Sequence, residues 1–283
     1  MINRLKALPQ YLIPKQAITI LAGKVASAKA GKVTTAIIAW FVKHYQVNMS
    51  EAAEPNIEAY DSFNEFFTRP LKKGVRRINK ADFISPVDGA ISQLGSIKAD
   101  QIFQAKGHHY STLALLAGNK KLADHFLNGS FATLYLSPKD YHRIHMPCDG
   151  KLKSMTYVPG DLFSVNPTTA QGVPGLFARN ERLVCEFQST HGTFVLILVG
   201  ATIVGSMATV WHGTINTPRP GKIKVWDFSH ENLSLKQGEE MGRFLLGSTV
   251  VMLFPENKLT FNRTWKAAKP VKFGEKMATL NHS

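Results

Sequence analysis

The distribution of apolar residues after residue 83 limits the fold of this chain more than any other feature. From Phe83 onward, short apolar or alternating runs are interrupted by Gly, Pro and Asp. These runs have the length of strands, and helical patterns among them are few. The spacing predicts largely antiparallel sheets, as a sandwich or a barrel, and not a βαβ alternation. The expected strands are Gly89–Leu94, Phe131–Leu136, Gly150–Val158, Leu183–Phe187, Phe194–Val199, Thr202–Thr214, Lys222–Trp226, Val250–Phe254 and Val271–Phe273.

Helical patterns lie mainly before these strands. Residues 14–47 predict two helices separated near Gly31, and Ser62–Phe67 predicts a third. Shorter helices are expected at Ser111–Leu116 and Lys120–Leu127. The expected fold class is therefore α+β, with N-terminal helices (residues 1–50) followed by a β-rich domain over residues 51–283.

Net charge points to a polyanionic partner. The chain of 283 residues has 34 Lys and Arg against 20 Asp and Glu, a formal net charge of +14. Residues 1–50 contain seven basic residues and no acidic one, which is half of the excess. Nucleic acid and an anionic membrane surface are the usual partners of such a chain. Here the charge lies on predicted helices and is not interleaved with stacking aromatics on a sheet, so nucleic acid is not expected.

The second N-terminal helix carries an apolar face. At 100° per residue Val33, Ile37 and Trp40 lie on one side, with lysines flanking them. Trp with flanking Lys suits the bilayer interface, so residues 1–50 are interpreted as a basic amphipathic membrane-association segment. A helix packed on its own domain, with solvated lysines, remains the alternative. The apolar run Ala36–Val42 is too short for a span, which takes about 20 residues.

Three clusters carry residue types suited to chemistry. Asp88 lies in Ser85-Pro-Val-Asp88-Gly89, where a simple turn is the alternative explanation. His142 and His145 lie within Ser137–Pro147, and no nearby Cys or Glu completes a metal site, so a proton-transfer role is favoured over a metal. Ser248 follows Gly247 ahead of an apolar strand. Together they permit an Asp, His, Ser triad, but without the GxSxG elbow of many hydrolases; a lipid hydrolase is the second hypothesis.

Several sequence motifs also resemble those of a known family. Leu246-Gly247-Ser248-Thr249 resembles the self-cleavage signature of the phosphatidylserine decarboxylase family, pyruvoyl-dependent membrane enzymes of which this chain resembles the bacterial type. Six further segments resemble that family in order, from Phe63 to Ser206. They are Phe63–Arg69, Ser85–Ala90, Lys106–Ser111, Tyr141–Pro147, Phe177–Arg182 and Val199–Ser206.

The resemblance implies both a reaction and a cofactor. Phosphatidylserine would be converted to phosphatidylethanolamine and CO2 by a carboxy-lyase. Its cofactor would be a pyruvoyl group derived from Ser248, which forms a Schiff base with the substrate amine. Self-cleavage between Gly247 and Ser248 would leave chains of residues 1–247 and 248–283. In it, the Ser248 hydroxyl attacks the Gly247 carbonyl, elimination gives dehydroalanine, and loss of ammonia leaves the pyruvoyl group.

The same resemblance assigns roles and partners. Asp88, His145 and Ser248 would carry out self-cleavage, and His142 would donate the proton in decarboxylation. Headgroup binding is expected from Tyr141, Arg143, Lys106 and Gly107. The two fragments would stay together as a heterodimer and pair further into a homodimer. The expected location is the cytoplasmic side of the cell membrane, as a peripheral protein bound to anionic lipid that includes its substrate.

Overall fold

A large antiparallel sheet forms the centre of the molecule. The computed structural model describes residues 8–202, 206–215, 221–245 and 248–281. Within them this sheet has nine strands, none of which closes it into a barrel. The prediction of an α+β protein with largely antiparallel sheets is confirmed, and the barrel is not the form it takes. The strand order is β12 (Lys224–Asp227), β7 (Gly150–Val158), β8 (Arg182–Ser189), β9 (Gly192–Val199), β15 (Ser248–Phe254), β5 (Ser130–Leu136), β2 (Gly89–Ser96) and β17 (Pro270–Val271), with β13 (Ser234–Leu235) beside β7.

Smaller sheets pack beside the large one. The strands are β11 (Gly213–Thr214), β10 (Met207–Thr209), β14 (Glu240–Phe244) and β6 (Arg143–His145) in one sheet, and β1 (Phe83–Ile84), β18 (Lys276–Leu280) and β16 (Leu259–Phe261) in another. The single strand expected over Thr202–Thr214 is wrong. The chain reverses direction between β10 and β11, which pair as antiparallel strands. Gly213, at the start of β11, has a φ of 77°, a conformation that residues with a side chain rarely adopt.

The central strands are buried on both faces, which explains their nearly continuous apolar sequence. On β9, Leu196 and Leu198 face a core shared with the smaller sheets, whereas Val195 and Ile197 face a second core. Helices cover the second core together with the hairpin of β3 (Gln101–Ala105) and β4 (His108–Ser111). These helices are α6 (Thr112–Leu115), α7 (Lys120–Asp124), α8 (Pro167–Ala170) and α9 (Leu176–Arg179).

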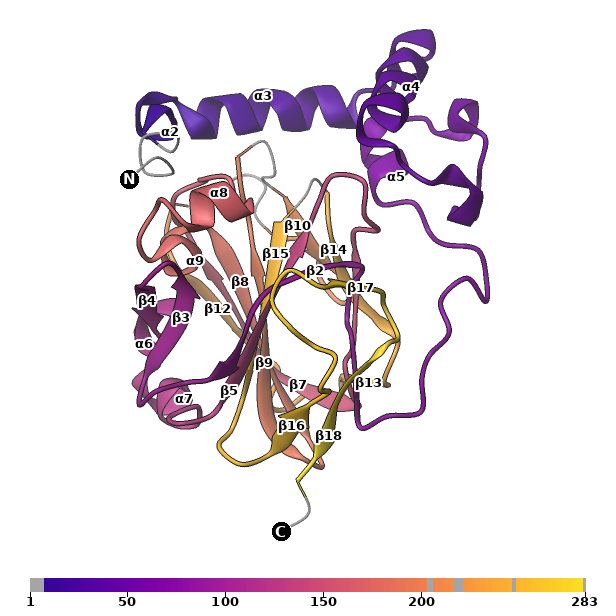
Figure 1. Ribbon diagram of the computed structural model, residues 1–283. Coiled ribbons are helices and arrows are strands. Elements are labelled where there is room, and N and C mark those ends of the chain that lie inside the picture. Colours follow the sequence, from indigo (N-terminus) through magenta and orange to yellow (C-terminus); the bar gives the residue numbers. More distant parts are fainter. Residues whose placement is uncertain (1–7, 203–205, 216–220, 246–247, 282–283) are drawn as a thin grey trace.

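The N-terminal helices lie across one end of the sheets, and the C-terminus lies at the opposite end (Figure 1). They are α2 (Pro9–Leu12), α3 (Lys15–Ser27), α4 (Lys32–Tyr45) and α5 (Phe63–Phe67), with 3₁₀ turns η1 (Met49–Glu51) and η2 (Ile57–Ala59) between α4 and α5. Gly31, with a φ of 54°, separates α3 from α4, which confirms the expected break. The Ser62 side chain accepts a hydrogen bond from the Glu65 amide and begins α5.

Helix α4 has two apolar sides with different environments. Ile38 and Phe41 are buried in a third core together with phenylalanines of α5. On another side Val33 is 61% exposed and Trp40 is 59% exposed. One face of α4 therefore packs on the chain itself, as the alternative interpretation expected, and the other face is exposed.

Candidate active site

The Asp88 turn lies where β2 begins, against the end of β5. Gly89 follows it, and a Cβ on Gly89 would lie 2.4 Å from the Tyr135 carbonyl oxygen. Only glycine permits this close approach of β2 to β5. The Ser85 hydroxyl donates to the Val87 carbonyl and closes the turn. The chain bends at residues 86–88 and places Asp88 at 1% exposure inside the molecule.

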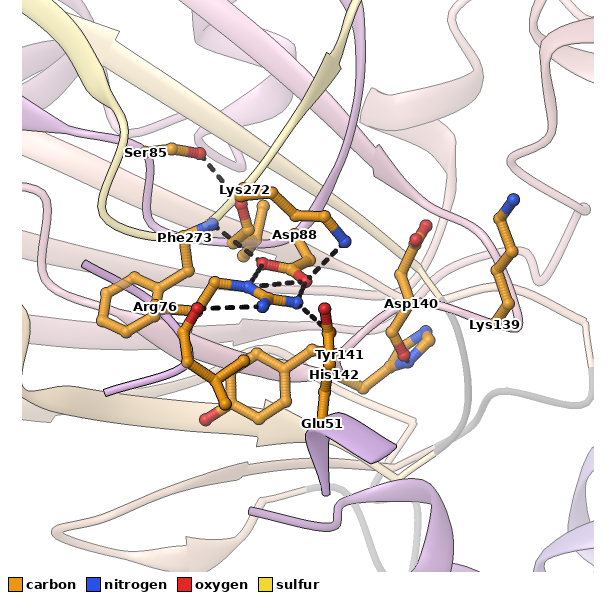
Figure 2. A network of polar contacts seen from close by, with 12 residues as sticks. Glu51, Arg76, Ser85, Asp88, Lys139, Asp140, Tyr141, His142, Lys272 and Phe273 are labelled. Carbon is orange, nitrogen blue, oxygen red and sulfur yellow. Dashed lines mark hydrogen bonds and ion pairs between the residues drawn. The ribbon is translucent and has the colours of Figure 1, made fainter. Parts of the chain in front are cut away.

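Asp88 is held in a dense cationic network (Figure 2). The Arg76 guanidinium donates to both carboxylate oxygens, with Nε 3.0 Å from Oδ1, and also pairs with Glu51. Lys272 Nζ lies 3.1 Å from Oδ2, and the Phe273 amide donates to Oδ1 at 2.8 Å. Burial alone would raise the pKa of Asp88, but the Arg76 and Phe273 hydrogen bonds and the Lys272 charge hold that pKa below its ordinary value. Asp88 is therefore a buried carboxylate at neutral pH.

Both ring nitrogens of His145 have partners. Nδ1 lies 2.8 Å from the Gly238 carbonyl oxygen, which can only accept, so Nδ1 carries the proton. Nε2 then accepts from the Tyr141 hydroxyl at 2.9 Å. Burial lowers the pKa of His145. The ring is therefore neutral at physiological pH, and its basic nitrogen faces Tyr141.

The sequence permits a triad in which Asp88 would orient His145, but among the described residues no hydrogen bond joins the two side chains. Asp88 is bonded to Arg76, Lys272 and the Phe273 amide. His145 is bonded to Tyr141 and the Gly238 carbonyl. Phe273 joins them instead: its amide donates to Asp88, and its ring stacks on His145 with centroids 3.7 Å apart. Asp88 and His145 are therefore linked through Phe273.

His142 is fully buried and retains a free basic nitrogen. Its Nδ1 donates to the Asp140 carbonyl at 2.8 Å, and its ring packs on Phe67 with centroids 4.1 Å apart. Its Nε2 has no hydrogen-bond partner among the described residues. Burial lowers the pKa of His142 to about 3. The ring is thus a neutral imidazole whose unpaired nitrogen is available to a bound molecule.

Ser248 begins β15, and its backbone pairs with Leu136 at the end of β5. The loop that follows Leu136 leads to Tyr141 and His142, while the Phe244 amide on β14 donates to the His142 carbonyl. Gly247 lies outside the described residues, and the Ser248 side chain is not described. The fold nevertheless places the backbone of position 248 opposite Leu136, from which the loop to His142 starts.

A cavity of about 190 Å³ lies beside these residues. The described residues that line it include Arg69, Arg76, Asp88, Tyr141 and Lys272. Three further cavity residues, Gln46, Asn48 and Glu51, come from the segment after α4. The N-terminal helices therefore contribute to the wall of this cavity.

The other expected headgroup residues have separate positions. Arg143 donates to the Thr68 carbonyl and pairs with Glu240 at 2.8 Å, so its charge is already compensated. Lys106 and Gly107 form the turn between β3 and β4, both with positive φ, next to the second core and outside the lining of this cavity. That turn accounts for the Lys-Gly pair on structural grounds.

Sequence reasoning missed the partners of Asp88 and His145. In the sequence Arg76 looks like an ordinary surface charge, Phe273 looks like the end of a short strand, and Gly238 lies in a loop. Arg69 belongs to a recognised segment but had no assigned role. No local pattern distinguishes these residues, because the contacts that matter join distant parts of the chain. Among the described residues, no three His, Cys, Asp or Glu side chains are placed to hold a metal ion.

The chain is similar to known proteins over almost its whole length. A family model described as phosphatidylserine decarboxylase matches residues 63–279, and one described as PSD matches residues 5–46. A phosphatidylserine decarboxylase proenzyme of Dechloromonas aromatica (strain RCB) is 70% identical over 279 residues, which are 99% of each chain. Proenzymes of the same name from Azoarcus sp. (strain BH72) and Herminiimonas arsenicoxydans are 65% and 66% identical, over 99% and 98% of this chain and 97% and 95% of their own.

These matches run through the buried acid, both histidines and the start of β15. The protein is an enzyme of the carboxy-lyase class. It belongs to the phosphatidylserine decarboxylase family, as its sequence resemblance had indicated.

Proposed function

We propose that the protein decarboxylates phosphatidylserine to phosphatidylethanolamine, using a pyruvoyl group that it makes by cleaving itself between Gly247 and Ser248. The observation that carries this is the position of Ser248 at the start of β15, paired with Leu136 beside the histidine loop. The proenzyme names of the relatives support a processed chain. The fragments 1–247 and 248–283 would remain associated, because β15 lies between β9 and β5 and its residues are buried from Thr249 to Phe254.

In self-cleavage, His145 would serve as the base. A neutral ring is required, and burial keeps the pKa of His145 below its usual value. The Tyr141 hydroxyl donates to the basic nitrogen of His145, so a Ser248 hydroxyl that donates to Tyr141 would pass its proton to His145 through it. Asp88 would act indirectly. It accepts a hydrogen bond from the backbone amide of Phe273, and the ring of Phe273 stacks on the His145 imidazole and would hold it in place.

The site is suited to the group that self-cleavage would form. When present, a pyruvoyl group supplies a carbonyl that accepts the electron pair released when CO2 leaves. The unpaired Nε2 of His142 is a buried basic atom that the described protein leaves without a partner, and buried polar atoms usually have one. His142 would take up a proton when an anionic substrate raises its pKa, and then deliver that proton to Cα.

We also infer attachment to the membrane through the N-terminal helices, on the cytoplasmic side and at anionic lipid. Apolar side chains there are open to solvent: Leu12 is 89% exposed and Leu21 is 64% exposed. In the described part of the chain no single helix is long and apolar enough to cross a bilayer, although α3 and α4, bent by 113°, meet that test as a pair. A helix with exposed apolar residues, lysines and Trp suits the interface. The homodimer stays a proposal from the family.

Self-cleavage is tested by the mass of the fragments. We expect wild-type protein to split, with a C-terminal piece of about 4 kDa at ~110 Da per residue. That piece should be lighter than the serine-ended peptide by the difference between serine and pyruvoyl ends, the mass of ammonia. Ser248→Ala should stay whole and inactive, whereas Ser96→Ala, an exposed serine on β2, should split normally. Wild-type protein that stays whole and yet decarboxylates the lipid would refute the pyruvoyl mechanism.

Membrane binding is tested by substituting exposed apolar residues of the N-terminal helices. Deleting these helices would also remove Ile38 and Phe41 from the third core and so disturb the fold. We expect Leu12→Gln, Leu21→Gln and Trp40→Gln together to reduce cosedimentation with anionic vesicles by more than about tenfold, because each large apolar side chain contributes ~1.5–3 kcal/mol when buried. Self-cleavage should be unaffected. The matched control carries Leu113→Gln, Leu127→Gln and Val225→Gln, apolar residues exposed elsewhere. Equal binding of both triple variants would contradict the assignment.

A further inference from the structure

Arg69 is a buried cation without an acidic partner in the ion pairs of the described residues. It is 3% exposed and lines the cavity beside Asp88. Its terminal nitrogens donate to the carbonyl oxygens of Phe66, at 3.3 Å, and Lys139, at 3.4 Å. The guanidinium also lies over the Phe66 ring, 5.1 Å from the ring centroid. Its Nε has no hydrogen-bond partner among those residues. A buried guanidinium with such weak partners is costly, so this position suits an anion that arrives with a ligand.

The other charges of the cavity are already compensated. Arg76 is paired with Asp88 and Glu51, and Lys272 is paired with Asp88. Asp140 accepts hydrogen bonds from the amide and hydroxyl of Ser137. Lys139 also lines the cavity, is exposed, and has no ion pair in the described part of the molecule. Arg69 and Lys139 are therefore the two cations that a bound anion would meet.

The cavity is well placed for the polar part of a lipid. Its lining includes the loop from Lys139 to Tyr141, which follows Leu136, the cross-strand partner of Ser248. The lining also includes Gln46 and Asn48, which follow α4. The cavity therefore borders both the loop that starts opposite Ser248 and the segment that follows the helix with exposed apolar side chains.

We propose that Arg69 and Lys139 bind the phosphodiester of the phospholipid headgroup. The inference rests on the proposed function and adds to it a site for one part of the substrate. Arg offers a planar set of donors that suits phosphate oxygens, and Lys adds a second charge.

The substrate contains two anions, and the chemistry favours the phosphodiester. The carboxylate leaves as CO2, so a cation that binds it stabilises the ground state more than the transition state and slows the reaction. The phosphodiester keeps its charge throughout the reaction. A cation bound there anchors the substrate without opposing the loss of charge at the carboxylate.

The test measures the decarboxylation of phosphatidylserine in detergent micelles by processed enzyme, with processing checked by mass. We expect Arg69→Met to raise KM by about tenfold or more with a much smaller change in kcat, because the variant loses charge-assisted hydrogen bonds to a part of the substrate that does not react. Arg69→Lys should recover part of the loss. Lys139→Met should raise KM less, and Lys121→Met, an exposed lysine on α7, should leave KM unchanged.

Two soluble inhibitors distinguish the anions. Glycerophosphoethanolamine has the phosphodiester but no carboxylate, and serine has the carboxylate but no phosphate. We expect Arg69→Met to weaken inhibition by glycerophosphoethanolamine and to leave inhibition by serine as it is. The opposite pattern, or an unchanged KM, would overturn the assignment. If the Arg69→Met variant does not cleave itself, the Lys139→Met variant provides the test. An unchanged KM together with unchanged inhibition by glycerophosphoethanolamine in that variant would overturn the assignment.

Failure of the proposed function would look different. Wild-type protein would then not decarboxylate phosphatidylserine at all. Calorimetric binding of glycerophosphoethanolamine to the wild type and to Lys139→Met would still test the anion site: weaker binding by the variant supports the site, and equal binding refutes it.

Discussion

Removal of the Arg76 guanidinium offers the sharpest test of the buried charge network. Arg76 connects Asp88, at 1% exposure, with Glu51, whose side chain is 30% exposed. We consider Arg76→Met in a Ser248→Ala background, so that a single uncleaved chain unfolds. The substitution keeps much of the side-chain volume and removes the charge. Asp88 would then retain only Lys272 and the Phe273 amide.

The expected loss follows from distance and burial. At the 3.0 Å separation of Arg76 Nε and Asp88 Oδ1, an effective dielectric of ~20 gives an attraction of about 5 kcal/mol. Lys272 and the Phe273 amide remain and offset part of this. Breaking one partner of a buried pair typically costs ~3–5 kcal/mol, and we therefore expect a loss of about 3 kcal/mol at neutral pH.

The pH dependence has a definite sign. The folded pKa of Asp88 lies below the unfolded value, so its contribution to stability is present above the unfolded pKa and is lost as pH falls through the folded pKa. Without Arg76, burial favours the protonated carboxyl. The difference in stability between the chain that retains Arg76 and the Arg76→Met variant should therefore be largest near neutral pH and shrink in acid.

The measurement is urea unfolding at several pH values. Asp88→Asn and the double variant complete a double-mutant cycle that isolates the pair. A loss below about 1 kcal/mol at pH 7, or one that grows in acid, would show that Arg76 does not hold a buried carboxylate; exposed pairs typically contribute only ~0–1 kcal/mol.

Three further outcomes test the site. Phe273→Ala should slow self-cleavage, because it removes the ring stacked on His145 while the backbone amide remains; Phe273→Leu should recover part of the rate in a time course on denaturing gels. His142→Ala should leave self-cleavage intact and abolish CO2 release in an assay with labelled lipid, whereas failed cleavage would contradict the separation of roles. Gly89→Val should yield little folded protein by circular dichroism, since its Cβ would lie 2.4 Å from the Tyr135 carbonyl oxygen; a normal yield would contradict the close approach of the strands.

Patterns of short range were readable in the sequence. The expected strands over Phe131–Leu136, Gly150–Val158 and Val250–Phe254 agree with β5, β7 and β15 within two residues at each end. Phe131–Leu136 and Val250–Phe254 are apolar runs that are buried along most of their length, whereas Gly150–Val158 mixes buried and half-buried residues. Both patterns are signals for strands. The run over Thr202–Thr214 misled because it contains a reversal at Gly213 that the composition of the run does not reveal.

Contacts of long range were not readable. Asp88 was identified as a site residue, but its partners Arg76 and Phe273 lie 12 and 185 residues away. Which charge meets Asp88 depends on how β2, β17 and the segment between α5 and β1 assemble. An arginine that will be buried looks the same in the sequence as one that stays in water. Arg69 was missed for the same reason, because its burial beside a cavity is visible only in the folded structure.

The sequence by itself determined the α+β class and the family, and it singled out the candidate site residues Asp88, His142, His145 and Ser248. It did so because strand patterns, turn residues and motif spacing act over a few neighbouring positions. Only the tertiary structure decided how these residues are connected. It assigned Asp88 to Arg76, His145 to Tyr141 and Gly238, and left the Nε2 of His142 unpaired among the described residues. Burial and sheet register set those pairings, and both arise only when distant segments of the chain pack together.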